Sequence, residues 1–208
     1  MGVHKSIVAV YLAAGRSKRM GQNKLDLPIG SSGCRIGSLA MKALLQSRVD
    51  RVIAVVPAAP LPLWIDPFSD AVAAKRLTIV QCADSVRGQG RSLRSGVMAA
   101  EKSQRVQGAL VCLADQPFVT VALLDQLLNA FDCTDSPFVA VRHEEVVSPP
   151  AVFSRALFDE LKAISGDQGA RQILRNRPGL CMEATADECF DVDTPHEYQV
   201  ALEKWKDE

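Results

Sequence analysis

Blocks of apolar residues alternate with polar segments along the chain and predict strands and helices in turn. The apolar run 7–12, β-branched at its start, is typical of a buried strand. The run 108–113, GALVCL, is apolar on both faces, as in the centre of a parallel sheet covered on both sides. Residues 120–131 carry apolar side chains at helical spacing behind Thr120, a favoured cap residue.

The same patterns predict the rest of the fold. Strand and helix alternate regularly as far as residue 141, which is the signature of a doubly wound parallel sheet. We therefore expect a Rossmann-like, three-layer α/β/α fold with a mostly parallel central sheet. The other expected strands are 51–56, 77–81, 137–141, 151–153 and 189–192; the other expected helices are 36–45 with Ser38 as cap, 67–75, 92–102, 154–164, 168–175 and a last one from Pro195.

Length, charge and cysteine content narrow the class of protein. A chain of 208 residues suits one domain, 1–208. Its formal net charge of zero argues against nucleic-acid binding, which relies on a basic surface. Six cysteines without zinc-ligand spacing indicate reduced thiols. No run is long enough for a membrane span, and the short N-terminal apolar stretch does not make a signal peptide, so we expect a cytoplasmic protein.

Three loops follow predicted parallel strands, at 13–24, 88–92 and 114–117. Ligands of open α/β sheets bind at this edge, so the three loops are expected to lie close together. The first loop combines small residues, including Gly15, with the cations Arg16, Lys18, Arg19 and Lys24. Free amides beside cations suit phosphate oxygens, although an ordinary turn with solvated charges has the same composition.

Acidic residues suggest a metal site facing this cationic loop. Asp115 follows the apolar strand 108–113 and is a candidate Mg²⁺ ligand, or alternatively the cap of a turn before Pro117. Asp191 and Asp193 form a second acidic pair, which alternation would direct to one side. Asp193 could instead cap the helix that begins at Pro195.

The sequence favours phosphoryl or nucleotidyl transfer over other chemistry. Lys24 is the first candidate to stabilise negative charge, because such reactions need cations and metal more than a protein base. The chain has no Gly-x-Ser-x-Gly elbow, no Walker loop and no Rossmann glycine pattern. A serine hydrolase, a P-loop enzyme and a dinucleotide-dependent dehydrogenase are therefore disfavoured.

Several motifs together resemble the MobA/MocA-like nucleotidyltransferases. The segment 12–21 with Lys24 is similar to the opening signature LAAGxSxRMGxxK of that family, 114–117 to its metal motif and 90–96 to its GxSxSLRxG segment. In the C-terminal third, 153–155, 166–171 and 191–195 resemble the branch that handles the molybdenum cofactor. The resemblance covers almost the whole chain.

The resemblance implies a nucleotidyltransferase fold and a division of labour within it. Residues 1–120 would mainly bind the nucleotide and 121–208 mainly the acceptor. Arg19, Lys24 and Asp115 would be catalytic, and Asp115, together with Asp193, would hold Mg²⁺. The implied nucleotide-binding residues are Leu12, Ala13, Ala14, Gly15, Arg16, Lys24, Gly90 and Ser92.

The same resemblance suggests the substrates. In this family Ala-Ala-Gly accompanies CTP and Ala-Gly-Gly accompanies GTP, so Ala14 favours CTP. Molybdopterin would then be the acceptor, the cytosine dinucleotide cofactor the product, and a molybdenum hydroxylase apoenzyme a possible partner. Two departures bear on the acceptor: 27–37 lacks the usual loop pattern, and Ser148-Pro149-Pro150 replaces the usual Gly-His-Pro. The alternatives are transfer to a sugar or alcohol phosphate, and an accessory protein that delivers the cofactor.

Overall fold

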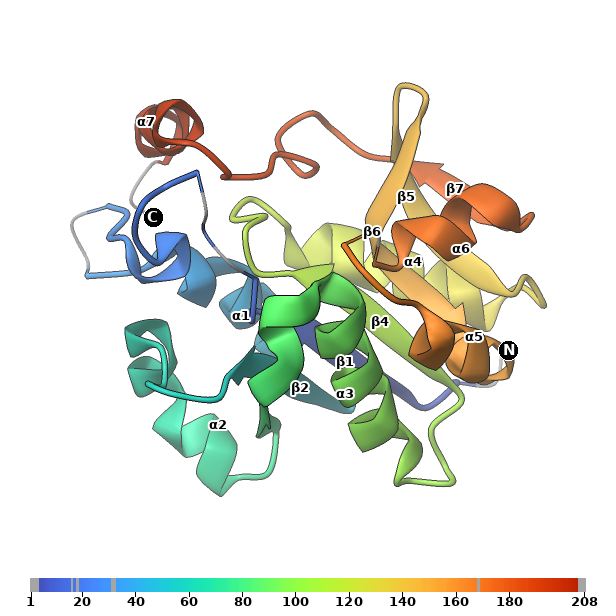
Figure 1. Ribbon diagram of the computed structural model, residues 1–208. Coiled ribbons are helices and arrows are strands. Elements are labelled where there is room, and N and C mark those ends of the chain that lie inside the picture. Colours follow the sequence, from blue (N-terminus) through green and yellow to red (C-terminus); the bar gives the residue numbers. More distant parts are fainter. Residues whose placement is uncertain (1–3, 16, 18, 31–32, 168, 206–208) are drawn as a thin grey trace.

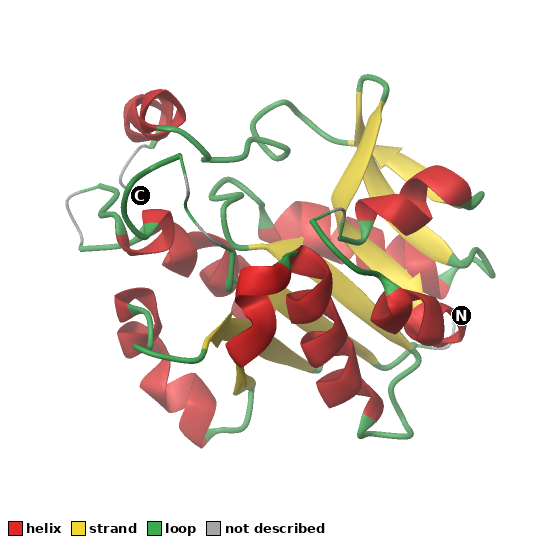
Figure 2. Cartoon of the chain, viewed as in Figure 1, coloured by secondary structure: helices red, strands yellow, loops and turns green. Residues whose placement is uncertain are grey.

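The chain forms a single mixed sheet with helices on both faces (Figures 1 and 2). The computed structural model describes residues 4–15, 17, 19–30, 33–167 and 169–205. Its seven strands are ordered β3-β2-β1-β4-β6-β5-β7. In chain order the strands are β1 (Ile7–Leu12), β2 (Arg51–Pro57), β3 (Leu77–Cys82), β4 (Gly108–Leu113), β5 (Phe138–His143), β6 (Val146–Ser154) and β7 (Leu180–Glu183).

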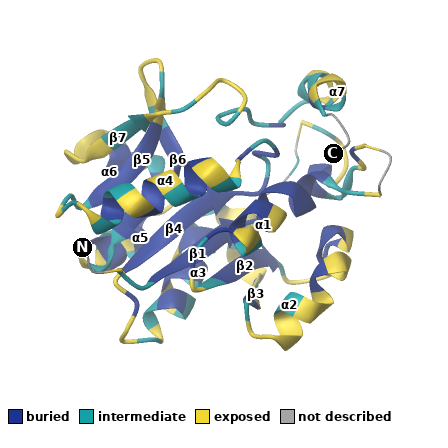
Figure 3. Cartoon of the chain, turned by 180° about the vertical axis from the view of Figure 1, so that it is seen from behind, coloured by how far each residue is buried: buried dark blue, intermediate teal, exposed yellow. Residues whose placement is uncertain are grey.

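The helices complete a three-layer arrangement, which confirms the expected fold class. They are α1 (Ile36–Gln46), α2 (Ser69–Ala73), α3 (Gln89–Glu101), α4 (Val121–Asp132), α5 (Phe158–Ala163), α6 (Arg171–Asn176) and α7 (Pro195–Lys204). Helices α3 and α5 cover the face towards the viewer in Figure 1, and α1 and α4 cover the opposite face, seen in Figure 3. No helix in the described ranges has the length and apolar character to span a bilayer.

Strand β1 is at the centre of the parallel part of the sheet. It pairs in parallel with β2 on one side and with β4 on the other, so that Val10 lies between Ile53 and Val111. All residues of β1 and β4 are buried. The carboxyl ends of both strands therefore open at the same edge, where their loops meet.

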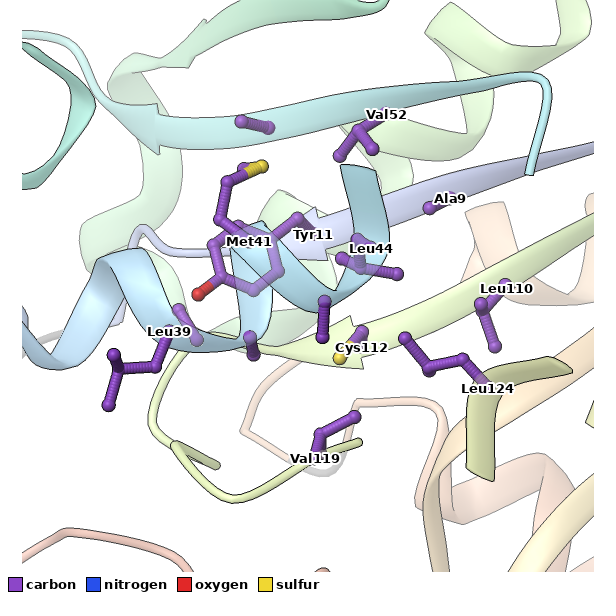
Figure 4. Close-up of a cluster of buried hydrophobic side chains, with 14 of the residues drawn as sticks. Ala9, Tyr11, Leu39, Met41, Leu44, Val52, Leu110, Cys112, Val119 and Leu124 are labelled. Carbon is purple, nitrogen blue, oxygen red and sulfur yellow. The ribbon is translucent and has the colours of Figure 1, made fainter. Parts of the chain in front are cut away.

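Alternate residues of these strands point to opposite faces of the sheet and belong to two separate hydrophobic cores. On the α1 and α4 side, Tyr11, Met41, Leu44, Cys112 and Leu124 pack together (Figure 4). Val10, Val55, Leu93, Val97 and Val111 pack on the opposite side, beneath α3. Because both faces are covered by helices, the central strands are apolar throughout, as the sequence pattern predicted.

Most elements match the predicted ones, with shifts at their ends. Thr120 caps α4 by accepting a hydrogen bond from the amide of Leu123, as expected. Ser38 does not cap α1; Arg35 holds the cap position, and Ser38 Oγ accepts its amide at 3.1 Å from within the first turn. Helix α3 begins at Gln89, three residues before the prediction, so Ser92 lies inside its first turn.

Two strand predictions in the C-terminal third were wrong or too short. The segment 189–192 is not a strand; the last strand is β7, a partly exposed edge strand paired in parallel with β5. Strand β6 is longer than predicted, runs antiparallel to its neighbours β4 and β5, and includes Pro149 and Pro150. The register against β5 jumps here, from Ala151 opposite Ala140 to Ser148 opposite Val141, so both prolines fall in an irregularity that needs no ladder amide.

Candidate active site

Lys24 is held at the carboxyl end of β1 by the local fold of the first loop. It begins a short 3-10 turn, Lys24–Asp26, which Asn23 caps by accepting the amide of Leu25. The amide of Lys24 itself donates to Ser17 Oγ at 3.0 Å. These contacts fix the main chain, and the residue as a whole is only 7% exposed.

The ammonium of Lys24 lies between two carboxylates from distant parts of the chain. Its Nζ atom is 2.6 Å from Asp115 Oδ2 and 2.7 Å from Asp193 Oδ1. Arg19 donates to the other oxygen of Asp193, Oδ2, at 2.7 Å. The structure thus brings together all three predicted catalytic residues and both predicted metal ligands.

The ionisation of the cluster follows from these pairs. Burial alone would lower the pKa of Lys24, but the charges of Asp115 and Asp193 outweigh it, and the pKa lies above its ordinary value. Burial likewise opposes ionisation of Asp193, but Lys24 and Arg19 hold its pKa below the usual range. Lys24 is therefore a cation and Asp193 an anion at neutral pH.

Asp193 reaches the cluster through a main-chain hydrogen bond, without a strand. The amide of Val192 donates to the carbonyl of Asp115 at 2.9 Å, which places the following residue beside Lys24. Thr194, and not Asp193, caps α7, in a reciprocal capping box with Glu197. The Asp193 carboxylate is therefore available for the site, and the alternative of a helix cap does not apply.

A pocket of about 260 Å³ opens beside this cluster. Both halves of the chain line it. Its predicted members are Leu12, Ala14, Gly15, Arg19, Lys24, Ser92, Asp115 and Asp193. Arg16 lies outside the described residues, so the structure adds nothing on its role.

Two predicted nucleotide-binding residues, Ala13 and Gly90, are not among the described residues that line the pocket. Ala13 is buried in the core, and its amide continues the sheet by donating to the carbonyl of Val55 at 2.9 Å. Gly90 is buried in the first turn of α3. Its amide donates to the carbonyl of Gly166, and a Cβ atom on Gly90 would lie 2.7 Å from the carbonyl oxygen of Ile164.

No individual role was predicted from the sequence for Gln116 or Arg171, and Asp191 was considered only as half of the acidic pair with Asp193. Gln116 is 1% exposed and donates from Nε2 to the carbonyl of Pro149. Asp191 pairs with Arg171 at 3.3 Å, while burial and the charge of Asp115 raise its pKa to about 6. Both Gln116 and Asp191 occur within the family motifs, but no local pattern indicates their contacts, which join segments remote in sequence.

The donor set suits a hard divalent cation. Asp115 and Asp193 converge on one cationic atom, so together they can hold a single positive ion. Mg²⁺ is bound by one or two carboxylates, completed by substrate phosphates and water. The described residues contain no cluster of three or more His, Cys, Asp or Glu side chains of the kind that forms an all-protein metal cage.

Comparison with known proteins agrees with this geometry. The sequence profile of the MobA-like NTP transferase domain matches residues 9–181. The chain belongs to this family. It is therefore a nucleotidyltransferase by family, and the pocket at the ends of β1 and β4 is the place where its fold and charges support that chemistry.

Named relatives carry several different functions. Purine catabolism protein PucB of Bacillus subtilis is 38% identical over 200 residues, which cover 93% of this chain and 95% of that protein. Nicotine blue oxidoreductase of Paenarthrobacter nicotinovorans is 31% identical and spans 90% of this chain and 92% of its own. A probable molybdenum cofactor guanylyltransferase of Mycobacterium avium is 31% identical over 64% of this chain and 61% of that protein.

Solved structures match the whole fold. Rv0371c from Mycobacterium tuberculosis superposes with a TM-score of 0.72 at 24% identity, and covers 97% of this chain and 100% of that chain. A second structure of Rv0371c, 25% identical with a TM-score of 0.68 over 97% of this chain and 100% of that one, is a complex with manganese.

Proposed function

We propose that this protein transfers CMP from CTP to molybdopterin and releases pyrophosphate, giving the cytosine dinucleotide form of the molybdenum cofactor. The observation that carries the proposal is the sharing of Lys24 between Asp115 and Asp193 in a pocket walled by Ala14 and Gly15. Carboxylates for a metal and cations for phosphates are the two requirements of nucleotidyl transfer.

Each charged residue has a distinct role in the proposed reaction. Asp115 and Asp193 would hold Mg²⁺, which supplies positive charge to the triphosphate when bound. A phosphate oxygen of the acceptor attacks the α-phosphorus; a new P–O bond forms, the bond to the β-phosphate breaks, and pyrophosphate leaves. Lys24 and Arg19 neutralise the charge that builds up on the transferring and leaving oxygens. Ser17 keeps the main chain of Lys24 in place through the hydrogen bond to its amide.

Ala14 supports CTP as the nucleotide. It lines the pocket, so its methyl group occupies space that a glycine would leave open. In the family resemblance, alanine at this position accompanies CTP and glycine accompanies GTP. The mycobacterial relatives named as guanylyltransferases match only about two thirds of this chain, with 28–31% identity. We therefore base the choice between CTP and GTP on the residue at position 14.

Molybdopterin is supported as the acceptor by the C-terminal motifs. Arg171 and Asp191 form an ion pair at 3.3 Å, and Asp191 is near enough to Asp115 for that charge to raise its pKa. The relative PucB is named for purine catabolism, and a role beside a molybdenum hydroxylase, as enzyme or as cofactor carrier, fits this proposal. Another relative is named an oxidoreductase. In this chain, the contacts of Lys24 with the carboxylates of Asp115 and Asp193 support transfer chemistry.

The test is a nucleotide screen. CTP, GTP, UTP and ATP are each supplied with Mg²⁺ and molybdopterin cofactor, and pyrophosphate release is followed. Fastest turnover with CTP is expected. Preference for GTP would overturn the inference from Ala14. Turnover only when a sugar or alcohol phosphate is supplied in place of molybdopterin would overturn molybdopterin as the acceptor. Tight binding of the cofactor without turnover of any nucleotide would support the accessory role.

A further inference from the structure

The turn at the start of α3 is in main-chain contact with the segment that follows α5. The amide of Gly90 donates to the carbonyl of Gly166 at 3.0 Å. A Cβ atom on Gly88 would lie 2.6 Å from the carbonyl carbon and oxygen of Gly166, so only glycine permits this approach. Gly88 also has a φ of +118°, a conformation that favours glycine. The contact fixes Asp167, the next residue after Gly166, at the rim of the pocket.

Asp167 lines the pocket beside the start of α3, and among the described ion pairs neither Lys24 nor Arg19 pairs with it. It lines the pocket together with Ser85, Gly88 and Gln89, which precede or begin α3. Lys24, Asp115 and Asp193 form another part of the lining, where the Lys24 ammonium pairs with both carboxylates. The Oδ1 atom of Asp167 is 2.9 Å from the position that a Cβ atom on Gly88 would take. Within the described part of the chain, the Asp167 carboxylate makes no hydrogen bond or ion pair.

We propose that Asp167 accepts a hydrogen bond from the amino group of the nucleotide base and thereby favours cytosine over uracil. The inference rests on the proposed function, because it takes the pocket to be a nucleotide site with the triphosphate beside Lys24. With the triphosphate there, we place the base against the wall formed by Gly88, Gln89 and Asp167, which takes no part in the Lys24 cluster. A carboxylate in this wall accepts hydrogen bonds and donates none.

The chemistry of the two pyrimidines makes the carboxylate selective. Cytosine carries a 4-amino group, which donates to a carboxylate, as in the Asp and Glu contacts that read cytosine in DNA. Uracil carries an oxygen at the same position, which would face the negative charge of Asp167 without a hydrogen. Selectivity arises both from the attraction and from this repulsion. Because Asp167 is exposed, water weakens both effects, and we expect about a tenfold to a hundredfold difference in affinity.

The experiment measures equilibrium binding of CTP and UTP, each with Mg²⁺, to the full chain by calorimetry, with no acceptor present. Three variants are compared with the unchanged protein. Asp167→Ala removes the acceptor, and Asp167→Asn replaces one acceptor oxygen by an amide that can donate to uracil O4. Asp84→Asn is the control, since Asp84 is an exposed acid in the segment before α3 that pairs with Arg87 and does not line the pocket.

The expected result is that Asp167→Ala loses about tenfold or more of CTP affinity with little loss for UTP, and that Asp167→Asn narrows the CTP:UTP ratio further. Asp84→Asn should keep the original ratio. An unchanged ratio in both Asp167 variants, with CTP still bound, would overturn this inference and leave the proposed function standing. Failure of the unchanged protein to bind any nucleotide with Mg²⁺ would overturn the proposed function and this inference together.

Discussion

Lys24 and Asp193 are 169 residues apart in sequence, yet Lys24 Nζ lies 2.7 Å from Asp193 Oδ1. Asp115, on a third segment, approaches the same nitrogen at 2.6 Å. One buried ammonium thus joins the loop after β1, the end of β4 and the start of α7. Any loss of this ammonium leaves two partly buried carboxylates facing one another, so its effects should reach beyond a single contact.

Replacement of Lys24 by alanine should abolish most activity. In the proposed reaction Lys24 is the cation that faces the transferring phosphate, and removal of one such charge-stabilising donor costs about 10² to 10³-fold in kcat. Steady-state pyrophosphate release measures this. Lys42→Ala, a change on the exposed side of α1, serves as control and should keep near-normal turnover. A Lys24→Ala enzyme within threefold of the unchanged protein would remove Lys24 from the chemistry.

Asp115→Asn should lose most activity while the protein stays folded. The amide keeps the shape of the side chain but removes the charge that a divalent ion requires. We expect turnover to fall by about 10²-fold or more and the Mg²⁺ concentration for half-maximal activity to rise. Circular dichroism checks the fold, and Asp135→Asn, at an exposed acid between α4 and β5, is the matched control. Unaltered Mg²⁺ dependence in Asp115→Asn would contradict the assignment.

Gly15→Ala should weaken nucleotide binding without weakening the fold. No atom lies within 4 Å of the position that a Cβ atom would take, so the folded protein can accommodate it. The added methyl group would enter the pocket, where the glycine allows a ligand to approach the main chain. We expect about a tenfold loss of CTP affinity by calorimetry and a change of less than about 1 kcal/mol in unfolding free energy. Equal CTP affinity in both proteins would place the ligand elsewhere.

Gly96→Ala should destabilise the fold without weakening nucleotide binding. A Cβ atom here would lie 2.3 Å from Val10 Cγ1 and 3.0 Å from Val55 Cγ2, where α3 packs on β1 and β2. Overpacking of this kind costs about 1 to 3 kcal/mol of unfolding free energy, measurable by urea denaturation. CTP affinity of the folded fraction should change little, because Gly96 does not line the pocket. A fully stable Gly96→Ala variant would show that α3 can move away from the sheet.

Cys112 should resist thiol reagents at pH 8 in the native protein. Its side chain is buried, and burial together with the charge of Asp115 raises its pKa to about 12. The reactive thiolate is then almost absent, whereas Cys133 is exposed and should be modified quickly. Mass spectrometry after brief treatment with a disulfide reagent identifies the labelled residues, and Cys133→Ser should remove the fast phase. Rapid labelling of Cys112 before unfolding would show that the β4 core opens readily.

Local sequence determined those parts of the protein that depend on neighbouring residues. The apolar runs of β1 and β4 predict buried central strands, and the structure has them at the same residues. Thr120 and Pro195 mark helix starts, because capping geometry is a matter of three or four consecutive residues. The loop after β1, with Lys24 and Gly15, lies at the edge of the sheet because it begins where that strand ends.

Tertiary structure decided the rest, where contacts between distant segments outweigh local preference. Proline disfavours a central strand, yet β6 accommodates Pro149 and Pro150 because a register jump against β5 leaves them without ladder partners. The segment 189–192 looks like a strand, but the hydrogen bond from Val192 to Asp115 holds it as a loop and brings Asp193 to Lys24. Asp167 reaches the pocket because Gly88 allows close contact with Gly166, and Gly90 allows close contact with Ile164. Such placements depend on packing across the whole sheet, which a single stretch of sequence does not encode.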